Sequence, residues 1–176
     1  MIDFSKNHFQ LFGLAPAFQL DLARVEQSYR DIQAQVHPDK FSQASDAERR
    51  LSMQWSTHVN EAYQTLKQPI NRARYLLKLH GVDTLDETNT AMSTEFLMEQ
   101  MEWREAIGEA KDAADATELD HLGTKLRQAM HQLQDDVGQR LDQLKDYPGA
   151  AEAVRKLRFL EKLREEINDA LETLEA

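Results

Sequence analysis

The chain has 176 residues, of which 41% are hydrophobic and 30% are charged, and its formal net charge is -10. Because nucleic acids and anionic membranes attract basic surfaces, this charge argues against both as partners and favours a protein partner. The chain has no cysteine, which excludes disulfides, thiolate metal sites and thiol nucleophiles.

Mostly helical structure is predicted, since 6 glycines and 4 prolines leave little room for a loop-rich β architecture. The N-terminal segment MIDFSKNHFQLFGL lacks a basic start and a long apolar core, so we expect neither a secretion signal nor an anchor. We therefore expect the chain to be cytoplasmic.

The same N-terminal segment predicts a helix of about two turns, ended by Gly13. A longer helix is predicted after the N-cap Asp21, where apolar residues recur three or four positions apart: Leu22, Val25, Tyr29, Ile32 and Val36.

Residues 35–41, QVHPDKF, interrupt this helical pattern. The residue before a proline avoids the α region, so Pro38 is predicted to end the helix and His37 to be extended. After a polar loop, Ser45 and Glu48 stand at capping-box spacing and predict the start of a second long helix. Its predicted buried face consists of Leu51, Trp55, Val59, Ala62 and Leu66.

Pro69 is predicted to begin a further short helix that stops at Gly81. Residues 82–92, VDTLDETNTAM, contain turn formers without a clear period, and we interpret them as a linker between two domains.

The remainder of the chain predicts an antiparallel three-helix bundle. Three helical runs cover roughly residues 94–115, 119–146 and 150–175, and the second run has an apolar stripe that ends at Leu144. A capping signal at Thr117 and Asp120 separates the first two runs, and Pro148 with Gly149 forms the next corner.

The tripeptide His37-Pro38-Asp39 has three interpretations. Taken alone, such a tripeptide is usually a simple turn, because proline fixes the backbone and aspartate accepts backbone hydrogen bonds. A rigid turn can also present an imidazole and a carboxylate to a partner at low entropic cost. An acid–base pair of an enzyme is the third interpretation, but no nucleophile elbow or phosphate loop completes it.

The six histidines show no paired spacing such as HExxH, so we predict no catalytic residue, metal site or cofactor.

The order of segments in the first half resembles a J domain, the module with which co-chaperones activate seventy-kilodalton heat-shock chaperones. FQLFGL, SYRDIQAQV, HPD and VNEAYQTL agree with that pattern in order and spacing over about residues 8–68. The resemblance implies that the HPD residues dock on the ATP-bound chaperone and stimulate its ATP hydrolysis, with Asp39 the indispensable member. The chaperone-binding candidates are His37, Pro38, Asp39, Lys40, Arg24 and Arg30.

The helix at residues 21–36 departs from many J domains, in which this helix is strongly basic. Here Arg24 and Arg30 are offset by Asp21, Glu26 and Asp31, so we expect weaker electrostatic steering toward an acidic chaperone surface.

Two segments of the second half and one that precedes it resemble the HscB family of J-type co-chaperones of iron–sulfur cluster assembly. They are RARYLLKLHGVD at 72–83, FLMEQMEWREA at 96–106 and VRKLRFLEKLR at 154–164. The resemblance implies an all-α fold, with a J domain and a short trailing helix at 1–81 and a three-helix bundle at 93–176. It implies an HscA-type chaperone and an IscU-type scaffold protein as partners, the scaffold being bound by the bundle. A helical adaptor that activates no chaperone is the alternative.

Helical geometry separates two apolar faces on the first helix of the bundle. At about 100° per residue, Trp103 and Ile107 fall within roughly 40° of Phe96, on a face suited to the bundle core. On the opposite side, Leu97 falls at about 100°, Met98 at about 200° and Met101 at about 140°. The J domain could cover this second stripe, or its members could be scattered surface residues; otherwise it is a binding surface.

Phe159 lies about 100° from the apolar stripe of the last helix and could border the same surface. In the HscB family the resembling positions bind the scaffold protein. The scaffold-binding candidates are therefore Leu97, Met98, Met101, Glu102, Glu105 and Phe159. Flexible methionines suit an adaptable surface, and the carboxylates can orient a basic partner.

Overall fold

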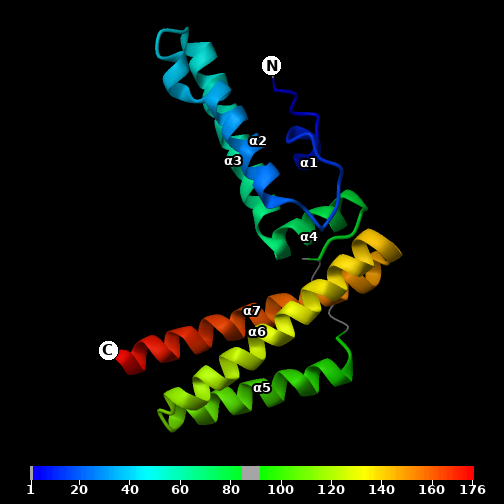
Figure 1. Ribbon diagram of the computed structural model, residues 1–176, viewed down its shortest axis with the longest axis vertical. Coiled ribbons are helices and arrows are strands. Elements are labelled where there is room, and N and C mark those ends of the chain that lie inside the picture. Colours follow the sequence, from blue (N-terminus) through cyan, green and yellow to red (C-terminus); the bar gives the residue numbers. More distant parts are fainter. Residues whose placement is uncertain (1, 85–91) are drawn as a thin grey trace. The chain divides into compact units, whose positions relative to one another are not determined.

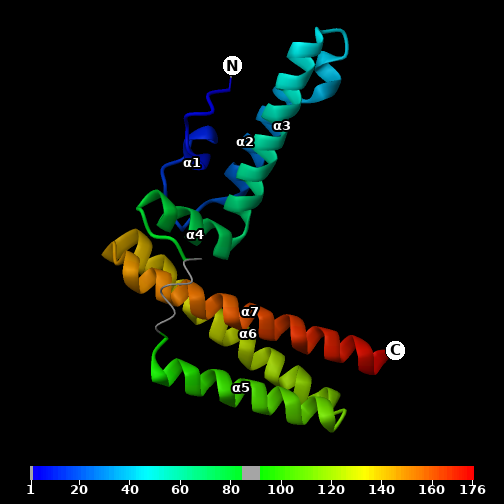
Figure 2. The same ribbon diagram turned by 180° about the vertical axis from the view of Figure 1, so that it is seen from behind.

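The computed structural model describes residues 2–84 and 92–176, and every regular element in these two ranges is helical, as the all-α prediction requires. The chain divides into two compact units, one ending at Leu76 and the other beginning at Leu77. Figures 1 and 2 show the helices of each unit from opposite sides. Within the predicted linker, residues 85–91 lie outside the described residues.

The first unit is built on an antiparallel pair of long helices. It contains α1 (His8–Leu11), α2 (Leu22–Val36), the 3₁₀ turn η1 (Pro38–Phe41), α3 (Asp46–Lys67) and most of α4 (Pro69–Leu79). α2 and α3 lie side by side, and η1 lies at the tip of the pair (Figures 1 and 2). The core of the unit includes Phe9, Phe12, Phe18, Val25, Val36, Val59, Ala62, Leu66 and Ile70.

Local capping starts both long helices where the sequence predicts. The Asp21 carboxylate accepts hydrogen bonds from the N–H groups of Ala23 and Arg24, and Ser45 and Glu48 form a capping box. Hydrogen bonds from the Ser45 hydroxyl and then from its backbone N–H lower the pKa of Glu48. The carboxylate is therefore ionised, and a negative charge lies at the positive end of the α3 dipole.

Some predicted details of the first unit are wrong. Leu22 and Leu51, predicted on buried faces, are 46% and 36% exposed. Leu22 is the first residue of α2 and lies at the margin of the helix pair, whereas on α3 the neighbouring Ser52 is the residue buried against α2. α1 has a single turn instead of about two, because the chain turns at Gly13 with a φ of +68°.

The second unit is a three-helix bundle, as predicted. Its elements are α5 (Thr94–Asp112), α6 (Ala116–Gly138), the π-helical turn η2 (Gln139–Leu144) and α7 (Tyr147–Glu175). All three helices pack against one another (Figure 1). The core includes Phe96, Ile107, Ala110, Leu119, Leu122, Leu126, Met130, Val137, Leu141, Val154, Leu157, Leu160, Leu163 and Ile167.

Two predictions for the bundle are wrong. The N-cap of α6 is Asp115, which accepts the Glu118 N–H at 2.9 Å, and not Thr117. The helix begins earlier because Ala114, with a φ of 49°, ends the preceding segment in a left-handed conformation. Leu144 is 60% exposed, because the π-helical turn changes the phase of the helix and moves this residue out of the apolar stripe.

Arg140 and Asp146 form the polar centre of the α6–α7 corner. Arg140 donates through Nη1 to Asp146 Oδ2 at 2.6 Å and through Nε to Asp136 Oδ2 at 2.9 Å. These hydrogen bonds raise the pKa of Arg140. Asp146 is the N-cap of α7. Its pKa is lowered first by the hydrogen bond that it accepts from the Gly149 N–H and then by its hydrogen bond and ion pair with Arg140.

Gly149→Ala is expected to destabilise the second unit. An added Cβ would overlap Oδ2 of Asp146 and Nη1 of Arg140, so both side chains would have to leave their hydrogen bonds. We expect the melting temperature, followed by circular dichroism, to fall by about 5 °C.

Gly108→Ala is the matched control on α5, since no side chain or neighbouring element lies within 4 Å of its added Cβ. Removing a glycine from a helix interior stabilises it by about 0.5–1 kcal/mol, so this melting temperature should equal or exceed that of the wild type. Equal losses in both variants would contradict the proposed packing of the corner.

Candidate functional site

The HPD corner is a short turn fixed by its own backbone. α2 ends at Val36, and His37 is extended, with φ −58° and ψ 135°, as predicted. Pro38 then begins η1. The Asp39 N–H donates to His37 Nδ1 at 3.3 Å, and the Lys40 N–H donates to the His37 carbonyl at 3.0 Å. These local contacts restrict the shape of the corner in the unbound protein.

The two ionisable side chains of the corner face solvent. The side chain of His37 is 54% exposed and that of Asp39 is 92% exposed. Asp39 Oδ2 lies 3.5 Å from His37 Nδ1, the same nitrogen that accepts the Asp39 N–H. The exposed Asp39 carboxylate keeps the capacity to accept hydrogen bonds from a partner.

The positive charges near the corner are spread along the helix pair. Lys40 lies on η1 itself and is exposed. Arg30 forms an ion pair with Glu26 on α2, and Arg24 is exposed closer to the start of that helix. Along the helix axis, Arg30 lies about 9 Å from Val36 and Arg24 lies about 18 Å from it. The structure therefore groups His37, Pro38, Asp39 and Lys40 in one turn and places the two arginines farther away.

Sequence reasoning missed Ser52, which lies directly behind the corner. Its side chain is 0% exposed, and its hydroxyl donates to the Val36 carbonyl at 2.8 Å. A serine within the polar run DAERRLSMQ carries no sign of burial. Only the register of α3 against α2 reveals it.

The second candidate surface is an apolar stripe on α5, formed by Leu97, Met98 and Met101. These side chains are 47%, 58% and 72% exposed, and the adjacent Glu102 and Glu105 are also exposed. The core side of the same helix is formed by Phe96, Ile107 and Ala110, as its helical geometry predicts.

Phe159 packs against α5 beside this stripe. Its ring is half-buried and contacts the ring of Phe96 edge-on, with the centroids 5.7 Å apart. The Arg104 guanidinium lies 5.3 Å from the centroid of Phe159 and 3.6 Å from Glu166. Arg104 was not among the predicted site residues, although its helical position, about 20° from Leu97, could have indicated it.

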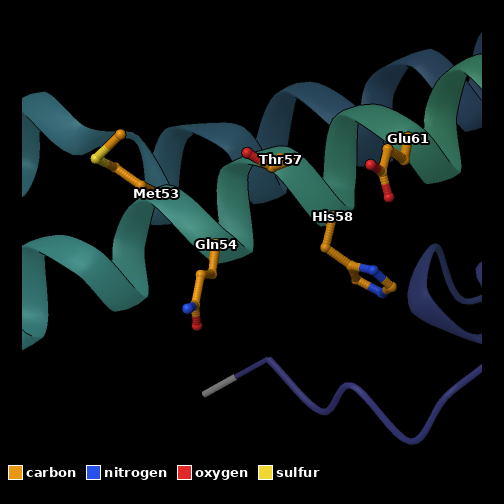
Figure 3. A pocket seen from close by; sticks show the side chains of 5 residues that line it. All are labelled: Met53, Gln54, Thr57, His58 and Glu61. Carbon is orange, nitrogen blue, oxygen red and sulfur yellow. The ribbon is translucent and has the colours of Figure 1, made fainter.

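A shallow depression on α3 is lined by Met53, Gln54, Thr57, His58 and Glu61 (Figure 3). His58 points toward the N-terminal segment, where its ring contacts those of Phe4 and His8 at centroid distances of 5.1 and 5.8 Å. His58 therefore has a packing role between α3 and the N-terminal segment.

The part of the chain that the structure describes contains no group of three or more histidines, aspartates or glutamates able to hold a metal ion. Within residues 2–84 and 92–176, no helix combines the length and apolarity needed to cross a membrane.

Comparison with known proteins covers nearly the whole chain. A family model described as the HSCB C-terminal oligomerisation domain matches residues 92–168. The co-chaperone protein HscB homologue of Azoarcus sp. is 50% identical over 174 residues, or 99% of this chain and 98% of the relative. The homologue of Aromatoleum aromaticum is 51% identical with the same coverage.

Two solved structures share the fold. The chaperone HscB from Vibrio cholerae matches with a TM-score of 0.84 and 35% identity, covering 96% of this chain and 99% of the other. Human co-chaperone HscB matches with a TM-score of 0.88 and 33% identity, covering 94% and 82%. These matches confirm a J domain joined to a C-terminal helical bundle, and the relatives are co-chaperones, which are not enzymes. The chain therefore belongs to the HscB family of co-chaperones.

Proposed function

We propose that this chain stimulates ATP hydrolysis by a dedicated HscA-type chaperone, delivers an IscU-type iron–sulfur cluster scaffold protein to it and so assists the maturation of iron–sulfur proteins in the cytoplasm. Membership of the family implies a partner among the seventy-kilodalton heat-shock chaperones. The observation that carries the proposal is the exposed HPD corner, with Asp39 presented on a turn of fixed shape.

The corner suits recognition of a cation on the chaperone. Asp39 has no hydrogen bond to its carboxylate among those of the described residues and is almost fully exposed, so it can accept a charge-assisted pair without first breaking another contact. The order imposed by Pro38 and by the hydrogen bond to His37 lowers the entropy lost on binding. Lys40, Arg30 and Arg24 would add steering toward an acidic surface.

The stripe on α5 suits a protein partner with an apolar patch. Leu97, Met98 and Met101 provide apolar area that the other described helices of the second unit leave exposed. Methionine side chains adapt to the shape of a partner, and Glu102 and Glu105 can pair with basic groups of the scaffold. Phe159 would border the contact through its packing against Arg104.

Two binding units on one chain give a delivery mechanism that needs no chemistry on this protein. In this proposal residues 1–81 form the J domain with its trailing helix, 82–92 the linker, and 93–176 the scaffold-binding bundle. A scaffold held by the bundle has a raised effective concentration beside the chaperone to which the J domain is bound. ATP hydrolysis stimulated at the corner can then be coupled to capture of the scaffold.

Asp39→Ala is expected to reduce stimulation of chaperone ATP turnover by about tenfold or more, because it removes the central charged group of the contact. The measurement is the ATP hydrolysis rate of the cognate HscA-type chaperone against increasing co-chaperone. Asp31→Ala, which removes an exposed carboxylate from α2, is the matched control and should retain most of the stimulation.

The fold of each variant is checked by circular dichroism. A wild-type protein that gives no stimulation would indicate the alternative, a helical adaptor that activates nothing. Full stimulation by Asp39→Ala would remove the corner from the proposal.

The double variant Leu97→Ala, Met101→Ala is expected to raise the Kd for the scaffold protein about tenfold, since it removes two apolar side chains from the contact. Calorimetry with purified scaffold measures this directly. Scaffold-independent stimulation of the chaperone should be unchanged.

Leu144→Ala with Leu174→Ala is the matched control, because these leucines of the second unit are also exposed, at 60% and 39%, but lie outside the stripe. A scaffold Kd that is the same for both double variants would refute the assignment of the stripe.

A further inference from the structure

Both ends of the HPD corner are held by α3. Val36 is the last residue of α2, so no backbone N–H of a following helical turn donates to its carbonyl. The Ser52 hydroxyl donates to this carbonyl instead, at 2.8 Å. Phe41, the last residue of η1, packs edge-on against Trp55, with the ring centroids 6.4 Å apart and an interplanar angle of 67°. Ser52 and Trp55 are three residues apart and thus neighbours on the surface of α3.

A ladder of polar side chains sets where α2 ends relative to α3. Asn60 Oδ1 accepts hydrogen bonds from the Tyr29 hydroxyl and from Gln33 Nε2. One turn along, Gln33 Oε1 accepts the Ser56 hydroxyl at 3.2 Å. Toward the tip the ladder steps by four residues on α3, and by four and then three residues on α2, so the last step brings Val36 to Ser52. The same interactions that fix the register therefore determine where the corner begins.

Trp55 contacts its neighbours through its aromatic ring, and its indole nitrogen, which is buried, forms no hydrogen bond with the described residues. Trp55 also contacts Phe4, with the ring centroids 6.5 Å apart and nearly parallel. The contribution of Trp55 to the corner is thus the face and edge of an aromatic ring, which phenylalanine can also provide.

We infer that Ser52 and Trp55 are positioning residues for the HPD corner, which hold Asp39 in the orientation that the chaperone recognises while touching no partner themselves. This inference rests on the proposed function of the corner. Without the Ser52 hydroxyl, the Val36 carbonyl is buried and unpaired, so the end of α2 can fray and the corner samples other orientations. Only molecules whose corner has the correct orientation can bind the chaperone, so the apparent affinity is the intrinsic affinity multiplied by the fraction of such molecules.

The test is the dependence of single-turnover ATP hydrolysis by the cognate HscA-type chaperone on the concentration of the full-length co-chaperone. Ser52→Ala should raise the half-stimulating concentration by about five- to tenfold while the maximal rate at saturation stays unchanged. Thr57→Val removes an exposed hydroxyl from the same helix, shown in Figure 3, and should behave as wild type.

Trp55 provides a second, independent arm of the test. Trp55→Ala should raise the half-stimulating concentration as Ser52→Ala does, and Trp55→Phe should restore it, because the unpartnered indole nitrogen contributes nothing to the corner. All variants are assayed well below their melting temperatures, so that a change in stability alone leaves the half-stimulating concentration unaltered.

Wild-type half-stimulating concentrations in folded Ser52→Ala and Trp55→Ala would overturn the inference while leaving the proposed function in place. If Ser52→Ala does not fold, the two Trp55 variants decide the question, and failure of phenylalanine to rescue would overturn the inference. Absence of stimulation by the wild type would instead refute the proposed function itself.

Discussion

The proline at position 38 is the constraint on which the first unit depends. Its ring forces His37 into an extended conformation, and it has no N–H to donate, so α2 ends at Val36. The Val36 carbonyl then needs a donor from elsewhere, which Ser52 of α3 provides. A helix that continued for one more residue would rotate everything after it by about 100° and would aim Asp39 in another direction. The residue at which α2 ends therefore determines the direction in which the Asp39 carboxylate points.

The two candidate surfaces differ in the physics that would give them affinity. The corner is small, polar and rigid, so its contribution depends on the position of one carboxylate more than on buried area. The stripe on α5 is apolar and rich in flexible methionines, so its contribution depends on the area that a partner covers and on how well the side chains adapt. Increasing salt should weaken the contacts of the first kind more than those of the second.

Local chemistry explains which features could be predicted from the sequence. Capping by Asp21 and Ser45 and the break at Pro38 depend on neighbouring residues only, and the structure has them where they were expected. The exposed stripe on α5 followed from helical geometry about the buried Phe96. These features need no knowledge of the tertiary fold.

The features that were missed depend on contacts between helices. Ser52 is buried because of the register of α3 against α2, and Leu51 is exposed for the same reason. Leu144 leaves the core because the helix widens into a π turn, which the apolar period does not reveal. The helical position of Arg104 places it beside Leu97, but its contacts with Phe159 and Glu166 depend on the packing of α5 against α7.

Arg104 also makes the two edges of the α5 stripe differ in charge. On the helical wheel of α5 it lies beyond Leu97 on one side of the stripe, whereas Glu102 lies beyond Met98 on the other side and Glu105 lies between Met101 and Met98. Its contacts with Phe159 and Glu166 hold the guanidinium on its side of the stripe, and it remains 56% exposed. In the proposed complex, a scaffold would meet the Arg104 cation along one edge of the apolar contact and the Glu102 carboxylate along the other. Apolar contacts alone tolerate several orientations, but a reversed scaffold would here bring like charges together at both edges, so these charges would favour a single orientation of the scaffold.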